Sequence, residues 1–155
     1  MGNLSDMRNP DEANRRRDWS GLEFSTANGK ITYPMDIDAL NDFYADRQMV
    51  VIEAKCEDAP MPDGELWGHK HLVDALQRGG VDALCIVGEH PILASNEPIV
   101  FHMMRVRCMR YKQRWWYPPK ELTVLDAYRL FRKPKAGDWP IGCMEFTWNE
   151  RPEEG

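Results

Sequence analysis

The sequence lacks several features that would assign it to a membrane or secreted class. No apolar run approaches the roughly 18 residues that a membrane-spanning helix needs, so no membrane contact is expected. The N-terminus has no apolar stretch of the kind found in signal peptides, and Asp6 stands where a myristoylation motif has serine or threonine. These absences favour a cytoplasmic protein.

Motifs for several kinds of site are also missing. There is no glycine-rich phosphate loop, which argues against hydrolysis of nucleoside triphosphates. His69 and His71 fall at i, i+2 on a predicted helix and would point about 200° apart, so they are not expected to share a metal ion. The cysteines are scattered without a C-x-x-C pair, which predicts reduced, mostly packed thiols at Cys56, Cys85, Cys108 and Cys143.

Charge is divided unevenly along the 155 residues. Residues 101–135 contain ten lysines and arginines and two acids, a balance of +8. Because the net charge of the whole chain is −5, the other residues carry −13. This division suits a protein that holds cations in one place and polyanions in another, although a solvated charged surface explains it equally well.

Hydrophobic periodicity and turn residues predict one mixed α/β domain over residues 1–155. A strand, a helix and a second strand in the middle of the chain indicate a right-handed crossover between parallel strands. The tail after about residue 134 is expected to wrap the surface. The expected elements are a helix over 9–17, a hairpin around Asn28-Gly29, a hairpin with arms 37–44 and 49–54, a helix ending at Gly79-Gly80, a strand over 81–89, two strands within 97–117, and a helix opening at Thr123 with a Leu122, Leu125, Tyr128 and Phe131 face.

Ionisable residues gather at one end of the second predicted hairpin. Glu53 and Lys55 share a face of one strand, because side chains alternate along it. Folding the hairpin about residues 45–46 places Asp38 opposite Glu53 within about a residue, with Cβ atoms roughly 5 Å apart. Two carboxylates this close repel each other, and Mg²⁺ prefers such oxygen ligands. We therefore predict a divalent cation, Mg²⁺ or Mn²⁺, held by Asp38, Glu53 and the backbone carbonyl of Ala54.

This arrangement predicts hydrolysis of a phosphodiester. A divalent cation polarises a phosphate oxygen and lowers the pKa of water bound to it. A neighbouring lysine, Lys55, would orient that water and offset charge in the transition state. The alternative is a surface salt bridge at the mouth of the sheet. A salt bridge explains Lys55 paired with one acid, but not the further charges beside the apolar run of residues 49–52.

The hairpin belongs to a longer pattern, in which DID is followed by VIEAK. The full pattern is WSGL…GKITYPMDIDAL…VVIEAK…MPDGELWGHKHLVDAL…ALCIVGEH. Over roughly residues 19–90 it resembles the PD-(D/E)XK nuclease superfamily, and within it a family of small phage-type proteins. The resemblance implies a restriction-endonuclease-like core: a mixed central sheet with antiparallel hairpins and flanking helices. It also implies a Mg²⁺- or Mn²⁺-dependent nuclease acting on DNA, in which Asp38 and Glu53 hold the metal and Lys55 is the catalytic lysine.

The resemblance leaves several residues open. Neither acid of DID follows the proline of the superfamily motif, so Asp36 stays a candidate ligand beside Asp38, which the hairpin geometry favours. Relatives often carry a further polar residue on the following helix, where Glu65 stands here. Many take an acid from the N-terminal helix, for which Glu12 is the candidate. Junction-cutting relatives are dimers, so a homodimer stays an option, and a phage protein would act in the host cytoplasm.

The stretch MRVRCMRYKQRWWY alternates basic and apolar residues, so its cations are expected on one face of a strand. There they would contact phosphates, while Trp115, Trp116 or Tyr117 could stack on bases. A half-buried edge strand with solvated arginines and core tryptophans is an equal alternative. A non-catalytic nuclease-fold protein that binds nucleic acid or a protein partner is the alternative function. The predicted nucleic-acid contacts are Arg105, Arg107, Arg110, Lys112, Arg114 and Trp115.

Overall fold

The computed structural model describes residues 26–29, 37–61, 63–94, 96–133, 139–140 and 142–147. By its internal contacts the chain divides into two compact units, residues 1–35 and 36–155. Within the first unit, the Gly29 N–H donates to the Thr26 carbonyl at 2.9 Å, and Gly29 has the positive φ, 79°, that the Asn28-Gly29 pair predicted. The predicted helix over 9–17, Glu12 and Asp36 lie outside the described residues.

The second unit contains a six-stranded mixed sheet in the order β1-β2-β3-β4-β5-β6. β2 and β3 are parallel, and every other neighbouring pair is antiparallel. The predicted α/β class is therefore confirmed. The elements are β1 (Ala39–Phe43), the 3-10 helix η2 (Tyr44–Asp46), β2 (Gln48–Cys56), α2 (Asp63–Arg78), β3 (Asp82–His90), the 3-10 helix η3 (Phe101–Met103), β4 (Arg105–Tyr111), β5 (Arg114–Tyr117), α3 (Val124–Arg132) and β6 (Met144–Phe146).

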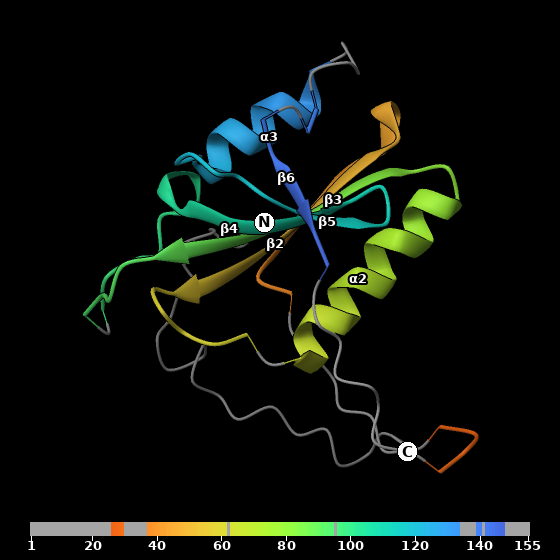
Figure 1. The fold of residues 1–155 in the computed structure, drawn as a ribbon, viewed down its shortest axis with the longest axis horizontal. Helices are drawn as coiled ribbons and strands as arrows, with labels where there is room; N and C mark the ends of the chain where they lie inside the picture. Colours follow the sequence, from red (N-terminus) through yellow and green to blue (C-terminus); the bar gives the residue numbers. More distant parts are fainter. Residues whose placement is uncertain are drawn as a thin grey trace, which may run out of the picture. The chain divides into compact units, whose positions relative to one another are not determined.

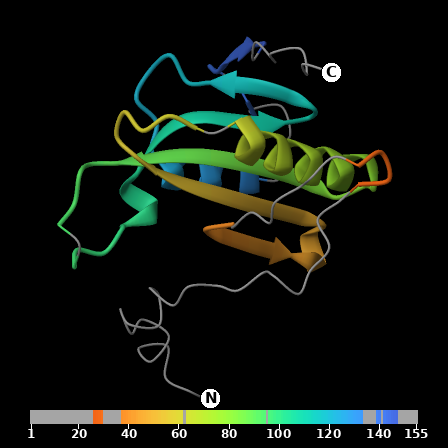
Figure 2. The same cartoon turned by 90° about the horizontal axis from the view of Figure 1, so that it is seen from below.

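The helices α2 and α3 cover opposite faces of this sheet, as Figure 1 and Figure 2 show. Because side chains alternate along a strand, Val50 and Ile52 of β2 pack into the core that includes Phe131 of α3, whereas Val51 packs with Val73 of α2. The apolar run of β2 is therefore buried on both sides, as its composition predicted. In the part of the chain that the structure describes, no helix is long and apolar enough to cross a membrane.

Helix α3 begins where the sequence predicted. The Thr123 hydroxyl accepts from the Asp126 N–H at 3.1 Å, and the Asp126 carboxylate accepts from the Thr123 N–H at 3.3 Å, which completes a capping box. Its buried residues are Val124, Ala127 and Phe131. Of the predicted face, Phe131 is in the core and Leu122 and Tyr128 pack against it, whereas Leu125 is not among the described residues of that core.

Two strands differ from their predicted bounds. β4 begins at Arg105, later than expected, because residues 101–103 form η3. The sequence did not predict β6, which adds to the sheet beside β5 with Trp115 opposite Phe146. The carboxyl ends of the parallel strands β2 and β3 meet at one edge of the sheet, where Lys55 lies in register with Glu89.

Candidate functional site

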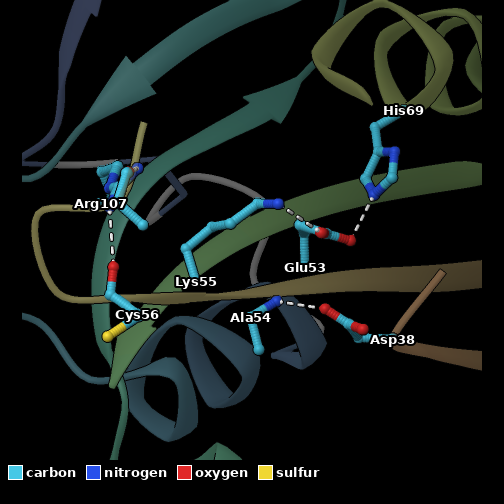
Figure 3. Close-up of polar contacts among 8 residues, drawn as sticks. Asp38, Glu53, Ala54, Lys55, Cys56, His69 and Arg107 are labelled. Carbon is cyan, nitrogen blue, oxygen red and sulfur yellow. Dashed lines mark hydrogen bonds and ion pairs between the residues drawn. The ribbon is translucent and has the colours of Figure 1, made fainter. Parts of the chain in front are cut away.

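Asp38 and Glu53 come together at the open end of the β1–β2 hairpin. Ala39 pairs with Ile52, so one further step along the register places Asp38 opposite Glu53, as the sequence predicted. The Asp38 Oδ2 accepts a hydrogen bond of 2.7 Å from the Ala54 N–H, which holds this carboxylate against β2 (Figure 3). The loop between the strands closes through η2 and through Arg47, whose φ is 53°.

The backbone of Ala54 is directed toward Asp38. In a strand, the N–H and C=O of one residue point to the same side, because residues in an antiparallel hydrogen-bonded pair exchange both bonds. Since the Ala54 N–H donates to Asp38, the Ala54 carbonyl also points to that side of β2. Glu53 is close enough to Asp38 to raise its pKa, and the Ala54 carbonyl lies on the Asp38 side of β2. These are the oxygens predicted to hold a cation.

Glu53 is buried, with 5% of its surface exposed, and has two cationic or polar partners. Its Oε2 lies 3.0 Å from His69 Nε2, and its Oε1 lies 3.2 Å from Lys55 Nζ (Figure 3). Desolvation by itself would raise the pKa of Glu53, but the hydrogen bonds from His69 and Lys55 outweigh it and lower this pKa below the ordinary value of 4.5. Glu53 is therefore held as a carboxylate.

Asp38 behaves in the opposite way. Desolvation raises the pKa of Asp38 above the ordinary value of 3.8, and the neighbouring Glu53 carboxylate adds to the rise. The hydrogen bond from the Ala54 N–H and the charge of Lys55 oppose the rise without cancelling it. Two facing carboxyl groups with pKa values shifted in opposite directions are typical of a functional site, although structural charge networks also produce such shifts.

His69 is the residue that sequence reasoning missed. It projects from α2 onto Glu53 and is 1% exposed, whereas His71 lies on an exposed side of the helix. Because a carboxylate only accepts hydrogen bonds, the Nε2 of His69 is the donor. Its Nδ1 is buried without a hydrogen-bond partner among the described residues. The sequence did contain a signal for His69. It is a polar residue on the apolar face of α2, the helix that follows the charged end of β2.

Glu89 extends the charged cluster onto β3. Its carboxylate accepts hydrogen bonds from Arg105 and Arg107, which lower its pKa even though desolvation acts in the other direction. Arg107 also donates to the carbonyls of Ala59 at 2.8 Å and Cys56 at 3.4 Å. Two arginines thus neutralise the acid that lies in register with Lys55.

The structure corrects the predicted nucleic-acid surface at two residues. Arg110 is buried and donates to both carboxylate oxygens of Asp74 on α2, at 2.9 and 2.7 Å. Trp115 is 5% exposed and packs in the core below α2. Neither side chain is available to a nucleic acid, because Arg110 is bound to Asp74 of α2 and Trp115 packs in a buried cluster with Leu66 of α2.

The other predicted contacts lie closer to the surface. Arg105 is 54% exposed and Arg114 is 60% exposed, each with one glutamate partner, Glu89 and Glu145. Lys112 lies in the tight turn between β4 and β5, with its Nζ 5.5 Å from the centre of the Tyr111 ring. The predicted accessory residue Glu65 is in the first turn of α2, and its side chain lies outside what the structure describes.

Comparison of the chain with protein-family models, with curated proteins and with solved structures finds no match. Among the described side chains, no three from histidine, cysteine, aspartate and glutamate gather into a metal cage. Mg²⁺ does not need such a cage, since it is commonly held by one or two carboxylates together with waters and substrate oxygens. The donor set of Asp38, Glu53 and the Ala54 carbonyl fits that chemistry.

Proposed function

We propose that the protein is a restriction-endonuclease-like enzyme that hydrolyses phosphodiester bonds in nucleic acid, with DNA as the expected substrate and Mg²⁺ or Mn²⁺ as cofactor. The observation that supports it most directly is the pairing of Asp38 with Glu53 beside Lys55 at one end of a hairpin. The order of a hairpin, a crossover helix and a parallel strand around this site supports the same fold assignment.

Asp38, Glu53 and the Ala54 carbonyl would hold the cation. When bound, a divalent cation supplies charge that polarises a phosphate oxygen and acidifies water. That charge would also offset the repulsion between the two facing carboxyl groups. Binding would therefore favour the ionised form of Asp38, whose pKa desolvation and the neighbouring Glu53 raise in the free protein.

The remaining residues prepare the site. His69 donates to Glu53 and keeps its carboxylate ionised and fixed in direction. Lys55 lies on the other oxygen of Glu53, where its ammonium can orient an attacking water and offset negative charge on the phosphate in the transition state. Of these side chains Lys55 is the more exposed, at 16% against 1% for His69, so it is the one that can meet a substrate.

The test compares Lys55→Ala with Lys133→Ala, a control that removes an exposed lysine at the C-terminal end of α3. Cleavage of labelled DNA is followed with Mn²⁺ and with EDTA, and circular dichroism checks the fold of each variant. We expect Lys55→Ala to lose at least ~100-fold in rate, the usual cost of removing one electrostatic stabiliser, with the fold retained. Equal cleavage by wild type and Lys55→Ala would contradict the proposal.

A second candidate is a non-catalytic protein on the same fold that binds nucleic acid or a protein. Two observations favour it: Glu53 already has two partners in the protein, and residues outside 101–135 carry −13. Calorimetry with Mn²⁺ separates the candidates, with Asp38→Asn tested against Asp42→Asn, which alters an exposed aspartate of β1. Binding that only Asp38→Asn abolishes supports the enzyme. Wild type that binds no Mn²⁺ supports the binding protein.

A further inference from the structure

An aromatic pocket opens beside Arg107, at the edge formed by β4, β5 and β6. Its volume is about 370 Å³, and it is lined by Met61, Arg107, Cys108, Tyr117 and Phe146. The rings of Tyr117 and Phe146 meet edge to face, with centroids 5.7 Å apart. A pocket of this size and composition accommodates a small planar group, with aromatic rings and a guanidinium available for stacking.

A polar groove of about 360 Å³ adjoins this pocket, and Arg107 lines both. The groove is also lined by Pro118 and Pro119, by the cations Arg105 and Lys120, and by the acids Glu89 and Glu121. Glu89 is already neutralised by hydrogen bonds from both arginines. The cations therefore outnumber the acids in the groove, and Arg105 and Lys120 present their charge to solvent.

Arg107 connects the pocket to the candidate catalytic site. Its guanidinium donates to the carbonyl of Cys56, the residue after Lys55 (Figure 3). It also donates to Glu89, which is in register with Lys55. Three hydrogen-bond acceptors hold this guanidinium in place, so its plane is preorganised where it lines the pocket. A chain of nucleotides that passes Lys55 would reach the groove and pocket next.

We propose that the pocket receives one unpaired nucleobase and the groove receives the phosphate of the same strand, so that the substrate is a single-stranded segment of nucleic acid. The assignment rests on the proposed nuclease function and names its substrate class. A paired base cannot enter, because both of its faces are covered by its neighbours in the duplex. Arg105 and Lys120 make an uncharged apolar ligand a poorer fit than a nucleotide, whose phosphate complements them.

The pocket is tested by binding in EDTA, where cleavage does not interfere. Fluorescence anisotropy compares a labelled single strand of about 12 nucleotides with a blunt duplex of the same sequence. Wild type is expected to prefer the single strand. Tyr117→Leu should weaken this binding about 5- to 100-fold, because stacking is lost, whereas Tyr117→Phe should bind like wild type. Tyr44→Leu is the control, since Tyr44 is an exposed tyrosine on η2.

The groove is tested by the salt dependence of the same binding. Arg105→Ala is compared with Arg129→Ala, because both arginines are exposed and Arg129 lies on α3 and lines neither pocket nor groove. Arg105→Ala should weaken binding and lower the slope of log affinity against log salt by about 0.7, the value for one phosphate contact on a single strand. Arg129→Ala should leave the slope unchanged.

Crosslinking tests the pocket without a mutation. Irradiation of wild type with a single strand carrying 5-iodouracil should attach the base to Tyr117 or Phe146, as peptide mass spectrometry would show. Adducts confined to other regions, a preference for duplex, or equal binding by Tyr117→Leu and wild type would overturn the proposal. These outcomes can be told apart from a failure of catalysis. Single-strand binding that depends on Tyr117, without any Mn²⁺-dependent cleavage, contradicts only the nuclease function. Cleavage that Tyr117→Leu does not change contradicts only the pocket.

Discussion

The buried pair of Asp74 and Arg110 offers the sharpest test of how the basic strand is used. Both side chains are nearly withdrawn from solvent, at 9% and 8% exposed, and two parallel hydrogen bonds join them. The guanidinium also lies 5.4 Å from the centre of the Trp115 ring. If Arg110 works inside the protein, its removal or that of Asp74 must reduce stability, with no direct effect on nucleic-acid binding.

The expected magnitude follows from what each change leaves behind. Asp74→Ala leaves a buried guanidinium without its carboxylate, which costs about 3–5 kcal/mol in the free energy of unfolding. At roughly 4 °C per kcal/mol for a domain of this size, the Tm falls by about 12–20 °C. The double change Asp74→Leu with Arg110→Met removes both charges and should recover most of the loss, because an apolar pair avoids the desolvation cost.

The assay is urea unfolding, followed by tryptophan fluorescence. It compares wild type with Asp74→Ala, with Arg110→Met and with the double variant. Arg114→Ala serves as the control, because its exposed ion pair with Glu145 should contribute no more than about 1 kcal/mol. A loss below about 1 kcal/mol for Asp74→Ala would refute the reasoning. If Arg110→Met is as stable as wild type and binds single-stranded DNA more weakly, Arg110 contacts nucleic acid, and the reasoning is refuted.

Three further predictions concern other parts of the sheet. Gly88→Ala should cost about 1 kcal/mol in urea unfolding, because its Cβ would lie 3.0 Å from Val124 Cγ2, while the end of the Met104 side chain at 2.9 Å can move. Glu89→Gln should lower the free energy of unfolding at neutral pH. The difference in this free energy from wild type should shrink as pH falls below 4.5 and through the lowered pKa of Glu89. A difference unchanged at pH 3 would contradict the arginine pairing. Burial raises the pKa of the Cys108 thiol to about 12, so iodoacetamide at about pH 8 should label native Cys108 far more slowly than half-exposed Cys56, as peptide mass spectrometry would measure.

Local pattern was sufficient for the hairpin and for its charged end. A strand alternates with period two, and a short loop sets the register, so the facing of Asp38 and Glu53 followed from counting residues on either side of the turn. The same applies to α3, whose capping box needs only residues three apart, Thr123 and Asp126. The apolar composition of β2 and β3 also predicted their central, parallel places.

Tertiary structure decided which charged groups are buried and what they touch. The alternation of basic and apolar residues in β4 suggested one basic face, but the strand carries a register shift opposite Val87 and Gly88, and most of it is covered on both sides. Arg110 therefore meets Asp74 inside the protein, while Arg105 stays at the surface. The partner lies 36 residues away in sequence, on a helix whose position the strand does not encode.

The local sequence pattern also could not predict the contact of His69 with Glu53, the β6 strand or the aromatic pocket. Each depends on contacts between segments far apart in the chain: α2 over β2, β6 beside β5, and Met61 and Arg107 around one cavity. The sequence by itself determined the periodicities, the turns and the residues that could hold a cation. Only the packing of α2 on the sheet determined that Glu53 is buried against His69, because burial is a property of the layers that surround a residue and not of its neighbours along the chain.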